Sequence, residues 1–172
     1  MKKHISIVVL LVLPLLFNGC GIYNFSGAST GTAESFQVNF FQNYADQSPG
    51  STIEPQLDRD FTNSLQDLIA NLTSLSLTSN GGDLVYEGEI VEYRVSPMSA
   101  SANQTAAQNR LTISVNVRFY NTTKEDSDFE RRFSFFFDFP GTQLLENVKG
   151  EAHEVIFERI TQDIFNASLA DW

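Results

Sequence analysis

This chain of 172 residues has little of the chemistry that enzymes use, with one cysteine, Cys20, and two histidines, His4 and His153. A single thiol excludes an internal disulfide, and so few cysteines and histidines leave no zinc-ligand spacing. A nucleophile that needs a histidine base has only these two to draw on. No phosphate-binding glycine motif is present. We therefore predict a protein that is not an enzyme and that has no metal and no cofactor.

Positive charge is also scarce. The chain has 11 Lys and Arg against 21 Asp and Glu, a net charge of −10. Without Lys2 and Lys3 at the N-terminus, 9 basic residues remain against 21 acidic residues, and the net charge is −12. This balance argues against nucleic acid or a broad anionic surface as the main partner.

No apolar run is long enough to span a membrane. The longest, Ile5 to Leu16, is interrupted by Ser6 and Pro14, whereas a spanning helix needs about 20 apolar residues. Lys2 and Lys3 before the run and Gly19 directly before Cys20 are typical of a lipoprotein export signal. We predict a signal peptide at residues 1–19 and a mature chain that begins at a lipidated Cys20. A free or partner-seeking thiol is the alternative.

The covalent lipid on Cys20 would anchor the protein to a membrane. Gly21 follows the cysteine and no acidic residue stands there to indicate retention in the inner membrane. We therefore expect the cell outer membrane, on its periplasmic side. Residues 20–34, rich in Gly, Ser, Thr and Ala, predict a lipidated tether, and residues 35–172 predict a single domain.

The first half of this domain predicts one strand and one helix. The strand begins at Ser35 and alternates, with three apolar side chains on one side. The helix shows apolar residues at steps of three and four, and Pro55 suits its first turn. The strand residues are Phe36, Val38 and Phe40, and the helix residues are Ile53, Leu57, Phe61, Leu65, Leu68 and Leu72.

The second half predicts three strands, over 83–96, 110–121 and 129–139, and a helix over 151–169. In the first strand the apolar side chains change parity after Ile90, which predicts a β-bulge near Val91. In the helix the inward residues are Val155, Ile156, Ile160, Ile164 and Phe165. The order predicts an α+β fold, a two-layer sandwich in which two helices pack on one face of a mixed sheet of about four strands.

One face of this sheet should be polar. Thr112, Ser114, Asn116 and Arg118 alternate with apolar residues. Glu87 and Glu89 lie two apart on a strand and point to one side, where a solvated face is favoured over a pair that shares a proton. His153, alone on its helix, predicts a solvent-facing or rim residue.

Four segments resemble the lipopolysaccharide-assembly outer-membrane lipoprotein family, LptE-like. They are residues 20–27 (CGIYNFSG), 83–90 (DLVYEGEI), 109–113 (NRLTI) and the tail from Asp163 to Trp172. The resemblance implies a lipoprotein that plugs the lumen of an LptD-type outer-membrane β-barrel, helps it assemble, and supports the insertion of lipopolysaccharide. Because barrel lumens are polar, a polar sheet face agrees with this.

The resemblance also implies basic contacts to lipopolysaccharide, but none of its positions maps onto this chain residue by residue. By charge alone the candidates for lipopolysaccharide or partner contact are Arg94, Arg110, Arg118, Arg131 and Arg132. Each of them could instead pair with a neighbouring carboxylate.

Two other functions remain open from the sequence. A periplasmic activator lipoprotein of a cell-wall synthase would use a similarly small domain. A lipid- or glycan-binding lipoprotein would need an apolar cavity, whereas the dense Phe and Leu pattern predicts a filled core.

Overall fold

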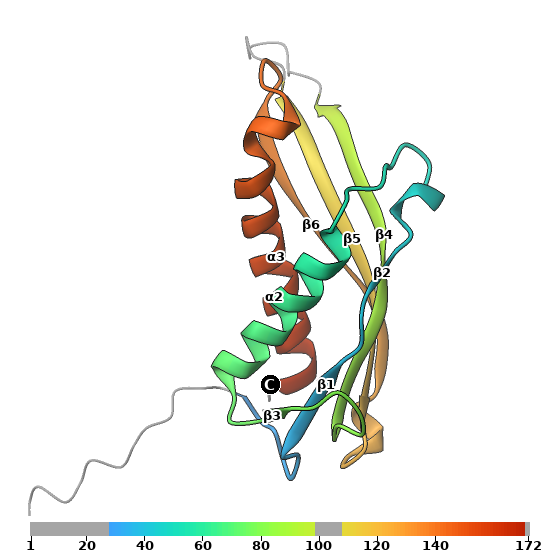
Figure 1. Ribbon diagram of the computed structural model, residues 1–172, viewed down its shortest axis with the longest axis vertical. Helices are drawn as coiled ribbons and strands as arrows, with labels where there is room; N and C mark the ends of the chain where they lie inside the picture. The colour runs from blue at the N-terminus through green and yellow to red at the C-terminus, as the bar shows by residue number, and fades with distance from the viewer. Residues whose placement is uncertain (1–27, 99–107, 171–172) are drawn as a thin grey trace, which may run out of the picture.

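The computed structural model describes residues 28–98 and 108–170. Figure 1 shows two long helices beside a twisted sheet of long strands. The helices are α2 (Leu57–Leu72) and α3 (Leu145–Leu169). Two 3-10 turns, η2 (Ala45–Gln47) and η3 (Glu125–Ser127), lie in the connections. The strands are β1 (Ser35–Val38), β2 (Gln42–Asn43), β3 (Ser76–Leu77), β4 (Leu84–Met98), β5 (Gln108–Asn121) and β6 (Phe129–Pro140).

The sheet is mixed and has the order β3-β1-β4-β5-β6, with β2 beside β4. β1 runs parallel to β3 and β4, whereas β4, β5 and β6 form an antiparallel meander. Both helices lie on the same face of the sheet (Figure 1). The predicted α+β class and layer arrangement are therefore confirmed. The sheet has six strands rather than about four because β2 and β3, two residues each, leave no alternation that a sequence pattern can reveal.

The predicted β-bulge is present. The pairing of β4 with β5 shifts register between Ile90 and Glu92, which leaves Val91 as the extra residue. Ile90 and Tyr93 are both buried against the helices as a result. The bulge therefore keeps the core side of β4 buried from the start of the strand to Tyr93, whereas Val95, beyond it, is 40% exposed.

The core fills the space between the sheet and the helices. Phe61 of α2 packs edge-on against Phe41 and Phe157, with ring centroids 5.1 and 5.5 Å apart. The prediction that Phe40 faces the core was wrong: Phe40 is 50% exposed and Phe41 is buried. The chain leaves β1 after Val38 and joins β4 again at Gln42, and this break shifts the alternation by one residue.

Both helices differ from their predicted bounds. α2 begins at Leu57, after Gln56 in a left-handed conformation (φ 68°), so Ile53 lies before the helix and is exposed. α3 begins at Leu145, ahead of the predicted start, because Gly150 is accommodated within it. Val155 was predicted to face inward but is 38% exposed, and Phe157 is buried instead.

Candidate partner-binding face

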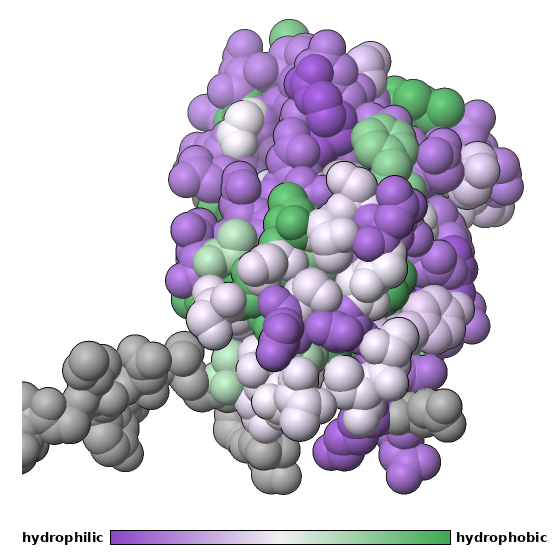
Figure 2. Space-filling model, turned by 60° about the horizontal axis from the view of Figure 1, so that its bottom comes forward, coloured by the Kyte–Doolittle hydropathy of each residue, from purple (hydrophilic) through white to green (hydrophobic). Residues whose placement is uncertain are grey.

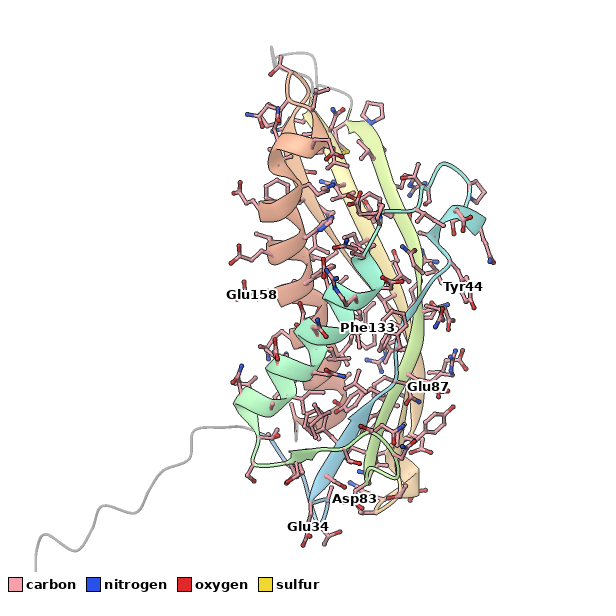
Figure 3. The ribbon with its side chains drawn as sticks, viewed as in Figure 1. Glu34, Tyr44, Asp83, Glu87, Phe133 and Glu158 are labelled. Atoms are coloured by element: carbon pink, nitrogen blue, oxygen red, sulfur yellow. The ribbon has the colours of Figure 1, made fainter. Side chains whose placement is uncertain are left out.

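The side of the sheet that faces away from the helices carries ion pairs between arginines and carboxylates of β4, β5 and β6, and we call it the open face. Figure 3 shows Glu87 and Tyr44 pointing away from the helices and Phe133 lying on the helix side of the sheet. The ion-paired residues of the open face are Glu87, Glu89, Glu92, Arg94, Arg110, Arg118, Arg132 and Asp138.

One cluster lies on the lower half of the open face, where Arg118 of β5 faces two carboxylates of β4. Its Nε donates to Glu87 Oε1 at 3.1 Å, and its Nη1 donates to Glu89 Oε2 at 3.1 Å. Asn39 and Asn116 donate to the same two carboxylates, each at 3.3 Å. The hydrogen bonds that Arg118 makes to the two carboxylates, the one to Glu87 above all, raise its pKa. The predicted solvated face is thus an ordered network of charges.

A second cluster surrounds Glu92 at the bulge, where the carboxylate is nearly buried. Arg94 Nη2 forms an ion pair with its Oε1 at 2.6 Å, and Arg132 Nη2 donates to its Oε2 at 2.7 Å. Ser114 Oγ donates to Oε2 at 2.8 Å and lies 2.9 Å from Ser134 Oγ. The cluster spans β4, β5 and β6, so one carboxylate ties together three strands.

A third cluster lies nearer the end of the sheet where Met98 of β4 pairs with Gln108 of β5. Arg110 forms a two-pronged pair with Asp138, Nε to Oδ1 at 2.7 Å and Nη2 to Oδ2 at 2.8 Å. The hydrogen bonds from Arg110 lower the pKa of Asp138. The same guanidinium lies over the ring of Phe136, with Cζ 3.5 Å from its centroid, a favourable cation–π geometry. Phe136 itself is 40% exposed.

The structure thus brings four of the five candidate arginines onto one surface and separates the fifth. Arg131 lies on the helix side of β6, 5.6 Å from the Phe129 ring and 6.0 Å from the Phe133 ring. Within the described part of the chain no carboxylate is within 4.0 Å of it. Each of the other four forms an ion pair with a carboxylate, which was the alternative interpretation of these arginines from the sequence. Cys20 lies outside the described residues.

Exposed aromatic side chains accompany the ion pairs. Tyr44, beside β2, is 46% exposed, and Tyr120 of β5 is 40% exposed. Sequence reasoning did not single out these two tyrosines. The signal for Tyr120 was its parity, since it follows Arg118 by two residues on the polar side of the strand.

His153 is half buried at the rim of the domain. Tyr93 Oη and His153 Nε2 lie 3.1 Å apart, and the imidazole stacks on Phe157 with centroids 5.5 Å apart. Burial lowers the pKa of His153, and nearby Glu54, Asp60 and Glu146 oppose this only partly. Across residues 28–98 and 108–170, no three His, Cys, Asp or Glu side chains are placed to hold a metal ion.

The N-terminal segment enters at the lower end of the domain. Ala28 pairs with Ala170, and Ser29 N donates to Leu169 O at 2.6 Å. A shallow pocket of about 440 Å³ lies beside this pairing. Figure 2, which brings this end forward, shows near-neutral and hydrophobic side chains gathered at the lower centre below a hydrophilic upper part.

Comparison with known families decides the relationship. The LptE family, described as lipopolysaccharide-assembly, matches residues 33–168. The chain belongs to this family. None of the curated proteins matches it. The LptE family is a family of non-enzymatic cell-envelope lipoproteins that act in lipopolysaccharide assembly.

Solved structures show more distant likenesses. A minor lipoprotein from Acinetobacter baumannii is 11% identical, with a TM-score of 0.45 and coverage of 78% of this chain and 91% of that one. The rare lipoprotein B from Shewanella oneidensis is 12% identical, with a TM-score of 0.45 and coverage of 76% and 89%. The PelC dodecamer from Paraburkholderia phytofirmans is 9% identical, with a TM-score of 0.45 and coverage of 84% and 93%.

In this LptE-family chain, neither of the two described helices is both long enough and apolar enough to cross a membrane.

Proposed function

We propose that the protein is an outer-membrane lipoprotein that seats its open face against the lumen wall of an LptD-type β-barrel. In that position it would support assembly of the barrel and insertion of lipopolysaccharide. The observation that carries the proposal is the open face itself, a polar surface of three long strands that no helix of the described chain covers.

The chemistry of the open face suits a polar lumen wall. Four guanidinium groups meet four carboxylates on it, so the ion-paired residues have no net charge. Covering these pairs leaves none of their eight charges without a partner, and an unpartnered charge is what makes the burial of ionised groups costly. Glu130, which is exposed on the same side of β6, has no ion pair among the described residues, so we place it outside the covered area. The exposed rings of Tyr44, Tyr120 and Phe136 add contact area of the kind enriched in protein interfaces.

The same pairing bears on contact with lipopolysaccharide. A phosphate that approached Arg110 would compete with both oxygens of Asp138. Arg94 and Arg132 share Glu92, yet both side chains are about half exposed, at 46% and 52%. We propose that these arginines act first as contacts to the barrel, and that Arg94 and Arg132 offer the more accessible N–H groups to a lipopolysaccharide phosphate.

Attachment to the outer membrane would come from lipid on Cys20. Ala28 is held at the lower end of the domain by its pairing with Ala170. A lipidated segment that precedes it would therefore direct this end towards the periplasmic leaflet and orient the long strands away from it.

Co-purification tests the proposal. Tagged protein extracted in mild detergent should recover a large outer-membrane barrel. Tyr120→Asp adds a charge to the open face and should reduce this recovery, whereas Asn63→Asp, on the exposed side of α2, should not. Repeated recovery of the tagged protein without any barrel would reject the proposal.

A further inference from the structure

β6 is a long strand at the edge of the sheet. Its 12 residues pair with β5 without a register shift, from Phe119–Phe129 to Gln108–Pro140. On its other side no strand of the described chain lies. α3 packs on the helix side of the sheet and does not continue the ladder (Figure 1). The outer edge of β6 therefore presents unpaired backbone N–H and C=O groups.

Natural edge strands are usually protected by shortness, bulges, an interior proline or charged side chains. β6 has no bulge, and its one proline, Pro140, is its last residue. It does carry charged side chains, at Glu130, Arg131, Arg132 and Asp138. These charges are of both signs, so a strand of complementary charge can still pair with it. Phe129, Phe135 and Phe137 are half buried along it, and Phe136 is 40% exposed. An edge strand of this length, with phenylalanines that are only partly covered, is suited to pairing with another strand.

The sequence of β6 is complementary to itself. From Arg132 to Asp138 it has opposite charges at its two ends, and four of the five positions between them, all except Ser134, are phenylalanine. We propose that two copies of the chain pair antiparallel through β6, with Phe135 on the two-fold axis. Arg132 would then stand opposite Asp138 of the second copy, and the same pair would form again across the axis.

No other extended register gives this match. Two antiparallel strands related by a two-fold axis keep their helices on one side, so residues of the same parity face each other. A centre at Ser134 would place Glu130 opposite Asp138, and a centre at Arg132 would place that arginine opposite itself. Opposite charges across a strand pair stabilise it, whereas like charges destabilise it.

The neighbouring side chains leave room for this pairing. Arg132 uses Nη2 for Glu92, and a guanidinium has further N–H groups for a second carboxylate. Asp138 accepts one hydrogen bond from Arg110 on each oxygen, and each oxygen keeps a second lone pair for Arg132 of the other copy.

An open groove of about 540 Å³ runs beside β6, lined by Arg131, Phe133, Asp163, Asn166, Ala167 and Ala170. Phe137 of the second copy, opposite Phe133, would cover part of this groove. Near the axis, Arg159 of α3 lies 5.6 Å from the Phe135 ring and pairs with Asp163 at 3.2 Å.

This pairing does not depend on the proposed function. It uses the edge of the sheet, whereas the barrel contact uses the open face. A paired sheet would be twice as wide, so we assign it to protein that is not seated in a barrel.

Disulfide trapping in intact cells tests the pairing with the full chain. Two copies with different tags are co-expressed, one with Ser134→Cys and the other with Phe136→Cys. Both side chains are exposed, so neither change should prevent folding, and the register places the two residues directly opposite each other. Oxidation should give a dimer that carries both tags and disappears on reduction.

The matched control replaces Ser134→Cys by Glu130→Cys. Glu130 is also exposed on the open side of β6, but the register places it about 13 Å from Phe136 of the other copy, too far for a disulfide. We expect at least about tenfold less mixed dimer from this pair. Equal amounts from both pairs, or no mixed dimer from Ser134→Cys with Phe136→Cys, would overturn the inference. The recovery of a barrel is measured separately and decides only the proposed function.

Discussion

The carboxylate of Glu92, on β4, accepts a hydrogen bond 2.7 Å long from Arg132, on β6, across the intervening strand β5. Because Ser114 of β5 donates to the same oxygen at 2.8 Å, all three strands of the meander share this one acceptor. The shared acceptor therefore holds β4, β5 and β6 together next to the β-bulge, where the register of β4 shifts.

Replacing the carboxylate of Glu92 should therefore destabilise the three-stranded meander. Glu92→Gln removes the charge that Arg94 and Arg132 share, and leaves donors with a weaker acceptor. We expect it to lower the free energy of unfolding by about 1–3 kcal/mol, measured by urea denaturation. Glu130→Gln, an exposed change on the same side of β6, should stay within about 0.5 kcal/mol. Equal stability of both variants would show that the Glu92 cluster contributes nothing.

A substitution at Gly88 tests the close packing of β4 against β5 and against Phe41. A Cβ at this position would overlap the backbone oxygen of Asn116 and lie 2.8 Å from Cε1 of the buried Phe41. Gly88→Ala should lower the free energy of unfolding by about 1–3 kcal/mol, as overpacking does. Gly150→Ala is the matched control, because nothing lies within 4 Å of its added methyl group. Within α3 it should raise stability by up to about 1 kcal/mol.

His153 should make stability depend on pH. Burial lowers its pKa from the ordinary 6.5, so the folded protein holds the imidazole neutral while the unfolded chain still takes up a proton. The contribution is complete above the unfolded pKa and is lost as pH falls below about 6.5 towards the lowered folded pKa. Thermal melts at pH 7.5 and 5.5 should show a smaller loss for His153→Gln than for the wild type. An identical loss would mean that other groups cause it.

Lipidation of Cys20 has its own test. Cys20→Ala should abolish incorporation of labelled palmitate, because no other cysteine is present. If a β-barrel also binds the folded domain, part of the unlipidated protein should still fractionate with the outer membrane. Complete release into the periplasm would show that the lipid is the main attachment.

The sequence predicted what depends on alternation. The three long strands, the bulge at Val91 and the polar side of β5 all follow from side chains that change face at every residue. It did not predict contacts that depend on the meeting of distant segments. Phe40 and Phe41 exchange roles because the chain breaks between β1 and β2, and Gln56 delays α2 by adopting a left-handed conformation.

In the candidate site too, strand alternation was predictable from the sequence and contacts between distant residues were not. Charge alone selected five arginines, and strand parity could have separated Arg131, at an odd position of β6, from Arg132 beside it. The partners could not be assigned in this way, since Glu92 reaches Arg132 only because β4, β5 and β6 lie in register.

Photocrosslinking in intact cells tests the central claim, that the open face is seated against a barrel, most directly. A photoreactive amino acid replaces Tyr120 on the open face or Glu158 on the exposed side of α3, which points away from the sheet (Figure 3). We predict that position 120 crosslinks to a large outer-membrane β-barrel and that position 158 crosslinks to it far less. Crosslinks to the barrel from position 158 alone, or from neither position, would contradict the claim.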